Sequence, residues 1–299
     1  MSWQSFVLNF AVRRRFKSQN SEGSTVEEAR FGLDSISGRK FRKPKKLNIT
    51  SFDEKGLTGE WLRYKNCDEN KVCLYFHGGG YFWGSPEKYR ALTSRLAKEF
   101  GGPVVAPDYR LAPETPYPAA IEDAVLAYKY VLETGVASNK IAIAGDSAGG
   151  GLALALVLAI KKEGLPFPAV VTLISPWTDL TCSGESMSFN IRKDPLFQPS
   201  MLMWNSRHYA GENEKSDPFI SPLFSDLTGL PPLLFQVGST EILLDDSRRA
   251  HQKIVEQGGS SKLDIWPNVM HVWHLAADFV PEGRRAIREM ASFMNIHIS

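Results

Sequence analysis

A serine stands between two glycines at residues 145–149, which read Gly-Asp-Ser-Ala-Gly. An apolar run precedes this motif and a long apolar helical pattern follows it, so the sequence predicts a strand, a sharp turn and a helix. Gly145 and Gly149 are small enough for strand and helix to pass closely. Ser147 is therefore a candidate nucleophile, and the Ala148 N–H at the helix start a candidate oxyanion donor. A glycine-rich turn with an idle serine is the alternative.

A second glycine motif lies upstream, where residues 77–80 read His-Gly-Gly-Gly after the apolar run 72–76. Three successive glycines let the backbone turn several N–H groups toward one point, so this loop can complete an oxyanion hole. A flexible turn is the alternative interpretation. The two motifs together are far more specific than either alone.

Strand-like apolar runs alternate with helical stretches over most of the chain. The first two runs are joined by a short turn, which favours an antiparallel start, and the later alternation is typical of parallel strands with crossover helices. We therefore expect an α/β fold with an eight-stranded, mostly parallel sheet flanked by helices. The expected strands lie at 47–52, 57–64, 72–77, 103–107, 140–145, 169–175, 232–237 and 262–266.

Further motifs stand in a familiar order along the chain. Residues 108–114 read Asp-Tyr-Arg-Leu-Ala-Pro-Glu, 118–123 begin Pro-Ala-Ala and end in Asp, and 175–180 read Ser-Pro-Trp-Thr-Asp-Leu. With the two glycine motifs, they resemble the hormone-sensitive-lipase-type carboxylesterases of the α/β-hydrolase superfamily over residues 47–299. The resemblance implies an α/β-hydrolase fold with a helical cap, and cofactor-free cleavage of carboxylic esters.

The resemblance also implies a division of the chain. Residues 1–46 correspond to N-terminal cap helices and a linker, and 183–216 to a cap insertion. Residues 47–182 and 217–299 correspond to the two parts of the hydrolase core. Aromatic and methionine residues in the insertion suit an apolar acyl-binding wall, although ordinary packing within a cap accounts for the same composition.

A hydrolase of this type needs a histidine base after the nucleophile and the acid. The chain has six histidines, of which His271 and His274 follow the strand-like run 262–266. The resemblance assigns the base to His271. His274 is the alternative, and we interpret it as a packing or surface residue.

The acid is expected after the strand-like run 232–237, where the family's position falls at Glu241. Most relatives carry aspartate there, so Asp245 and Asp246 stay as alternatives. Glutamate meets the chemical requirement, because the third triad member is a carboxylate that hydrogen-bonds one imidazole nitrogen. The resemblance assigns the remaining oxyanion donors to the N–H groups of Gly79 and Gly80.

Composition excludes several other classes. A formal net charge of +2 gives no argument for nucleic-acid binding. Cys67, Cys73 and Cys182 are odd in number and lack metal-ligand spacing, so we expect a reducing, cytoplasmic location without a disulfide framework. We expect no metal and no cofactor. The resemblance is also compatible with a homodimer.

The N-terminus carries Trp3, Phe6, Val7 and Phe10 at helical spacing, followed by three arginines. A signal peptide has its positive charge before the apolar segment, so this order does not fit secretion. We expect an amphipathic helix that packs its apolar face on the protein, with an interfacial membrane helix as the alternative.

No stable membrane insertion is expected, because the longest apolar run, 152–160, is too short to cross a bilayer. We interpret this run as the buried helix behind Ser147. The basic run 39–46 is interpreted as a solvated linker, with phosphate binding as the alternative.

These features predict a serine hydrolase that cleaves short- to medium-chain carboxylic esters through an acyl-enzyme, with Ser147, Glu241 and His271 as its triad. Lactone or amide hydrolysis by the same triad is the closest alternative, because the pocket selects the leaving group. A non-catalytic small-molecule receptor is the alternative from another class. Receptors of this superfamily typically lack the serine or the histidine, and this chain has both.

Overall fold

The computed structural model describes residues 2–16, 25–34 and 41–298. It contains an eight-stranded sheet with the order β1-β2-β4-β3-β5-β6-β7-β8. Strands β1 and β2 pair antiparallel, β2 pairs antiparallel with β4, and all later neighbours are parallel. The expected α/β-hydrolase architecture is confirmed. The strands are β1 (Leu47–Glu54), β2 (Leu57–Tyr64), β3 (Val72–Phe76), β4 (Val104–Pro107), β5 (Ile141–Asp146), β6 (Val170–Ile174), β7 (Leu233–Gly238) and β8 (Ser261–Trp266).

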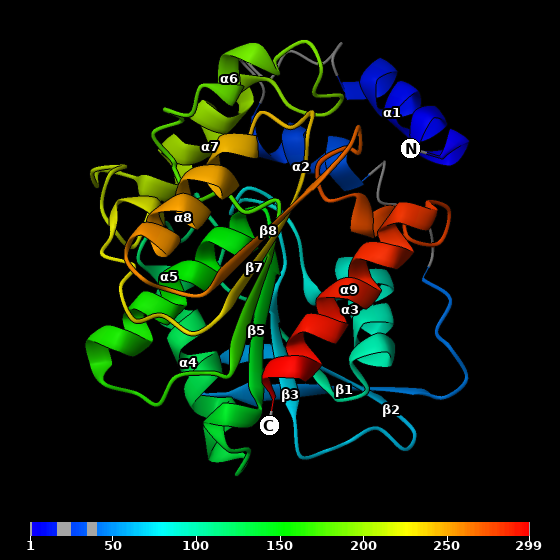
Figure 1. Ribbon diagram of the computed structural model, residues 1–299, viewed down its shortest axis with the longest axis vertical. Coiled ribbons are helices and arrows are strands. Elements are labelled where there is room, and N and C mark those ends of the chain that lie inside the picture. The colour runs from blue at the N-terminus through cyan, green and yellow to red at the C-terminus, as the bar shows by residue number, and fades with distance from the viewer. Residues whose placement is uncertain (1, 17–24, 35–40, 299) are drawn as a thin grey trace.

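Helices cover both faces of this sheet (Figure 1). Helices α3 and α9 pack together on one face, and α4, α5 and α8 lie on the other. The α-helices are α1 (Trp3–Phe16), α2 (Val26–Asp34), α3 (Pro86–Phe100), α4 (Ala119–Glu133), α5 (Ala148–Glu163), α6 (Ser186–Phe189), α7 (Pro199–Ala210), α8 (Leu244–Glu256) and α9 (Pro281–His297). Short 3₁₀ turns are η1 (Ser138–Lys140), η2 (Pro222–Phe224) and η3 (Trp273–Ala276).

Strand β3 is apolar and buried at every position. Leu74 and Phe76 pack into the core beneath α4 and α5. Cys73 and Tyr75 pack into the core beneath α3 and α9. Successive side chains of a strand point to opposite faces, so helices on both sides of the sheet bury both sets of side chains and favour an apolar strand.

Helix α5 is buried along most of its length, from Ala148 to Ile160. This confirms the interpretation of the run 152–160 as a core helix behind Ser147. Among the described residues, no helix is long and apolar enough to cross a membrane.

The two segments expected to form a cap contribute α1, α2, α6 and α7, which lie together at one end of the sheet (Figure 1). Parts of the N-terminal segment, residues 1, 17–24 and 35–40, lie outside the described residues. The basic run is therefore described only from Arg42 onward, where its lysines and arginine are exposed before β1.

The orientation of α1 differs from the expectation. The helix forms, but Trp3, Phe6 and Phe10 are 66%, 61% and 62% exposed, so the prediction that its aromatic side packs on the protein was wrong. Polar side chains of α1, such as Ser5, face the protein instead and hydrogen-bond to it. Periodicity predicts which residues share a face of a helix, but not which face the rest of the fold contacts.

Candidate active site

Ser147 occupies the turn between β5 and α5. Its backbone has φ 53° and ψ −122°, a conformation that non-glycine residues rarely adopt. The Ser147 N–H donates to the Ile174 carbonyl (2.9 Å), and its own carbonyl accepts from the Trp177 N–H (2.9 Å). These bonds to the end of β6 and the loop after it hold the unusual conformation in place.

The flanking glycines are required by close backbone packing. A Cβ atom on Gly145 would lie 2.2 Å from the Gly149 carbonyl oxygen. A Cβ atom on Gly149 would lie 2.2 Å from the Phe76 carbonyl oxygen at the end of β3. Any larger residue would therefore push the start of α5 away from the sheet, which supports the mechanical reason for the motif.

His271 and Glu241 meet at the carboxyl ends of the neighbouring strands β7 and β8. His271 Nδ1 lies 2.6 Å from Glu241 Oε2, and the Glu241 side chain is fully buried. The other carboxylate oxygen, Oε1, accepts from Ser175 Oγ (2.8 Å) and from the Gly238 N–H (2.5 Å). Both oxygens are hydrogen-bonded, so the carboxylate is held in one orientation against the imidazole.

The alternative acids have other partners. The Asp246 carboxylate accepts from two backbone N–H groups, one of them Thr178 N–H at 2.7 Å, and burial raises its pKa to about 8. The Asp245 carboxylate accepts from the Ser186 N–H (2.8 Å). The structure thus brings Glu241, and neither aspartate, to hydrogen-bonding distance of His271.

The alternative histidine lies in the core. His274 is fully buried, and its Nε2 lies 2.9 Å from Gln236 Oε1 on β7. Burial lowers its pKa to about 3, so the ring is neutral at pH 7. His274 is a packing residue in this structure, which matches one of the two roles expected for it.

The buried histidines predict a loss of stability in mild acid. Burial lowers the pKa of His274 to about 3 and that of His77 to about 4, whereas unfolded histidine titrates near 6.5. Below pH 6.5 the unfolded chain therefore binds more protons, and stability falls as the pH drops toward these folded-state values. Each histidine contributes up to about 1.4 kcal/mol per pH unit in this window.

This pH effect can be separated from that of carboxylates by substitution. His274→Gln should flatten the dependence of the melting temperature on pH between pH 6.5 and 5. The partly exposed His297, changed to glutamine, serves as the control and should leave the slope unchanged. Parallel curves for wild type and His274→Gln would contradict this explanation.

Asp146 connects the two glycine motifs, a role that the sequence analysis missed. Its Oδ1 accepts from Tyr75 Oη (2.7 Å) and from the Gly78 N–H (2.9 Å), and its Oδ2 accepts from Tyr89 Oη (3.3 Å). Burial raises the pKa of this carboxyl to about 6. A carboxylate at the end of an apolar, buried strand needs such partners, and that was the signal available in the sequence.

Two backbone N–H groups of the glycine loop, those of Gly79 and Gly80, are left without a hydrogen-bond acceptor among the described residues. Gly79 and Gly80 have φ of 117° and 63°, in the region that favours glycine. A Cβ atom on Gly80 would lie 2.5 Å from Asn205 Nδ2 on α7, so the loop packs directly against that helix.

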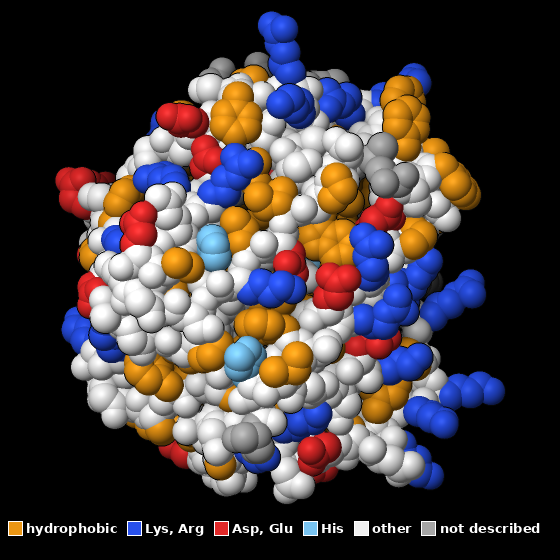
Figure 2. Space-filling model, viewed as in Figure 1, with side chains coloured by type: hydrophobic (Ala, Val, Ile, Leu, Met, Phe, Trp, Pro, Cys, Tyr) orange, Lys and Arg blue, Asp and Glu red, His pale blue; other side chains and the backbone are white. Residues whose placement is uncertain are grey.

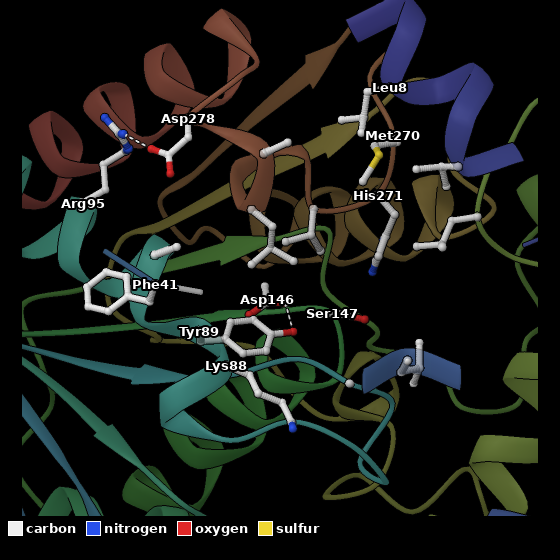
Figure 3. Close-up of a pocket in the computed structure, with 18 of the residues that line it drawn as sticks. Leu8, Phe41, Lys88, Tyr89, Arg95, Asp146, Ser147, Met270, His271 and Asp278 are labelled. Carbon is white, nitrogen blue, oxygen red and sulfur yellow. Dashed lines mark hydrogen bonds and ion pairs between the residues drawn. The ribbon is translucent and has the colours of Figure 1, made fainter. Parts of the chain in front are cut away.

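Several of the candidate catalytic groups line one cavity of about 1580 Å³ (Figure 3). Ser147, His271 and both loop glycines line it, together with residues of α1 and α7. Within the described part of the chain, buried His271 Nε2 has no hydrogen-bond partner, and in Figure 3 the ring points toward Ser147. The Phe197 ring packs edge-on against the imidazole, with 4.6 Å between centroids. The arrangement offers a hydroxyl, an unpaired base and free N–H donors in one apolar cavity.

A model of the family described as "alpha/beta hydrolase fold" matches residues 73–275, which include the glycine loop, Ser147, Glu241 and His271. The chain belongs to the α/β-hydrolase family. Over 237 residues, 79% of each chain, this α/β hydrolase is 43% identical to an acetyl-hydrolase of Streptomyces hygroscopicus. It is 36% identical to an esterase of Acinetobacter venetianus over 292 residues, 97% of this chain and 96% of that one.

Solved structures agree with these relatives. The α/β hydrolase superposes on the crystal structure of an esterase from the bacterial hormone-sensitive lipase family with a TM-score of 0.94 and 35% identity, covering 100% of this chain and 99% of that one. It also matches an esterase crystal soaked with p-nitrophenyl butyrate, with a TM-score of 0.92, 35% identity and 99% of each chain covered. The resemblance to hormone-sensitive-lipase-type esterases is confirmed.

Proposed function

We propose that this α/β hydrolase is a serine esterase that cleaves carboxylic esters through an acyl-enzyme. The observation that carries the proposal is the His271 ring, with Nδ1 bound to Glu241 at 2.6 Å and Nε2 unpaired among the described residues, in the cavity that Ser147 lines. The esterases and the acetyl-hydrolase among its relatives support the same chemistry.

In the proposed acylation step, Ser147 Oγ attacks the ester carbonyl carbon while His271 Nε2 takes the hydroxyl proton. Glu241 keeps the other ring proton on Nδ1, so that Nε2 presents its lone pair, and stabilises the imidazolium that forms. The negative charge on the tetrahedral oxygen is stabilised by the N–H groups of Gly79, Gly80 and Ala148.

Collapse of this intermediate breaks the bond to the alcohol, which leaves with the proton from His271 Nε2. A water molecule then loses a proton to His271 Nε2 and attacks the acyl carbon. Collapse of the second tetrahedral intermediate breaks the bond to Ser147 Oγ, which takes the proton back from His271 as the acid is released. Every proton moves between Ser147, the imidazole, the leaving alcohol and water, so the cycle needs no cofactor.

Lactone or amide hydrolysis by the same residues and a non-catalytic receptor remain the competing functions. A panel of p-nitrophenyl esters, lactones and anilides separates them. We expect the highest kcat/KM on the esters. A higher kcat/KM on a lactone or anilide would reassign the substrate class, and binding without turnover of any of them would favour the receptor.

We propose short- to medium-chain acyl groups as substrates, with α1, α2, α6 and α7 as a cap over the site. Met201 and Leu202 of α7 line the cavity, as does Phe197 just before the helix. A relative named acetyl-hydrolase and the matching esterase crystal soaked with p-nitrophenyl butyrate support small acyl groups. The expected optimum lies at about four to eight acyl carbons, because the proposed cap encloses the site.

Two methionines on α7 provide a test of this acyl wall. Met201 lines the cavity, whereas Met203 is 42% exposed and does not line it. Met201→Trp should shift the optimum in a p-nitrophenyl ester series to shorter acyl chains, because the larger ring fills part of the cavity. Met203→Trp is the matched control and should keep the wild-type profile. An unshifted profile for Met201→Trp would remove α7 from the acyl wall.

We further propose a cytoplasmic location. Cys67, Cys73 and Cys182 form no disulfide, and burial raises the pKa of the Cys182 thiol to about 12. Unpaired, inert thiols are typical of proteins in reducing compartments. A homodimer, which the family resemblance allows, stays a prediction.

A further inference from the structure

Helix α1 is held with its polar side toward the protein. Ser5 Oγ donates to Glu282 Oε2 on α9 (3.0 Å). One turn later, Asn9 Nδ2 donates to a backbone carbonyl after β8 (2.9 Å), and after another turn Arg13 donates to two carbonyls between α6 and α7 (2.6 Å each). These contacts recur at every turn of the helix, so they fix which side of α1 faces outward.

The outward side is apolar. Trp3, Phe6, Val7 and Phe10 are between 46% and 66% exposed, and we call them the α1 aromatic face. The Trp3 ring lies edge-on to Phe279, itself 37% exposed, with 5.8 Å between centroids. Figure 2 shows hydrophobic side chains gathered at the edge of the molecule over α1. A patch of this kind in water marks an interaction surface.

Basic residues lie next to this face. Helix α1 and residues 41–46 together contain seven lysines and arginines and no acidic residue. Figure 2 shows Lys and Arg side chains along the same side of the molecule, below α1. Five of these basic residues, all of them exposed and without an ion pair to a described carboxylate, carry the argument. We call them the basic rim: Arg14, Arg15, Arg42, Lys45 and Lys46.

The basic rim and α1 belong to one surface. Arg42, Lys45 and Lys46 line the large cavity, and so do Val7 and Leu8 of α1. A second copy of the chain docked by the same face would bring like charges together, which opposes association. An anionic, partly apolar surface complements both features.

We propose that the α1 aromatic face docks the protein reversibly on a bilayer surface rich in anionic phospholipid. Aromatic side chains of an interfacial helix insert at the level of the headgroups, and nearby lysines and arginines gain from the negative surface potential. Docking in this orientation would turn the part of the cavity that α1 lines toward the lipid surface. The proposal concerns docking alone and does not depend on the proposed esterase mechanism.

Co-sedimentation of the full chain with vesicles tests the docking. We expect binding to mixed phosphatidylcholine and phosphatidylglycerol vesicles to exceed binding to pure phosphatidylcholine by about tenfold or more, and to weaken as salt screens the charges. Phe6→Ser with Phe10→Ser should reduce binding by at least about tenfold, because two inserted rings are lost. Both side chains are exposed, so circular dichroism should show an intact fold.

Three further variants complete the experiment. Val255→Ser with Ile296→Ser removes apolar side chains that are 50% and 74% exposed on α8 and α9, and should bind as wild type. Arg14→Glu with Arg15→Glu should abolish the preference for phosphatidylglycerol. Ser147→Ala should bind vesicles like wild type, so a failure of the esterase proposal is distinguishable from a failure of docking.

Several results would overturn the proposal. One is an absence of binding to phosphatidylglycerol vesicles, and another is equal binding to both lipids. Wild-type binding by the Phe6, Phe10 variant would remove α1 from the surface. A dimer seen by light scattering that the same variant converts to a monomer would assign the face to a second copy instead.

Discussion

Replacing Ser147 with alanine is expected to lower kcat by about 10⁴ to 10⁶, because the variant loses the atom that forms the acyl bond. The Ser147 side chain that is removed has no hydrogen bond to another described side chain, so the variant should retain the fold. The measurement is the rate of p-nitrophenyl butyrate hydrolysis by variant and wild type, with circular dichroism of both.

Covalent labelling locates the nucleophile independently of the rate. A serine-directed phosphonate should add its mass to the peptide that contains Ser147, and to no other. Ser206→Ala is a suitable control, because Ser206 is a buried serine of α7 whose hydroxyl donates only to Met203 O (3.0 Å). A labelled peptide elsewhere, or a Ser147→Ala variant with wild-type activity, would exclude the proposed mechanism.

Replacing Glu241 with glutamine is expected to lower kcat by about 10² to 10⁴, with a smaller effect on KM. The carboxylate now accepts on Oε1 from Ser175 and Gly238, and Oε2 lies against His271 Nδ1. An amide has one acceptor oxygen for these donors. If that oxygen faces Ser175 and Gly238, the NH₂ group faces Nδ1 and favours the tautomer that protonates Nε2, which cannot act as a base.

The aspartates that follow Glu241 provide the comparison. Asp245→Asn and Asp246→Asn should each lower kcat much less, because their carboxylates bind backbone N–H groups away from His271. Glu241→Asp should recover part of the loss, since it restores the charge with a shorter reach. Near wild-type kcat for Glu241→Gln, together with a collapse in a folded aspartate variant, would move the acid to that aspartate.

The strands and the turn at Ser147 follow from local patterns in the sequence. Each expected strand matches an observed one within one or two residues at either end, and β2 matches at both ends, Leu57 and Tyr64. These patterns succeed because burial on both faces favours apolar residues, which occupy every position of β3 and positions 141–144 of β5. The glycines at 145 and 149 are likewise local requirements, because a Cβ atom at either position would meet a backbone oxygen at 2.2 Å.

The partners of the buried carboxylates depend on contacts between distant segments. Nothing in the local sequence separates Glu241 from Asp245 and Asp246, because all three follow the same strand. The separation arises because β7 and β8 are parallel neighbours, so the segments after their carboxyl ends lie side by side and bring Glu241 to His271, 30 residues away. Asp146 binds Gly78, 68 residues away, for the same reason across β3 and β5.

The sequence alone therefore determined the sheet, the turn at Ser147 and the aromatic stripe of α1, all of which depend on the spacing of residues within one segment. Only the tertiary structure decided which carboxylate meets His271 and which side of α1 faces outward. Hydrogen bonds from Ser5, Asn9 and Arg13 to distant parts of the fold determine the second of these. Periodicity places side chains on a common face, but the partner of that face is set by long-range packing.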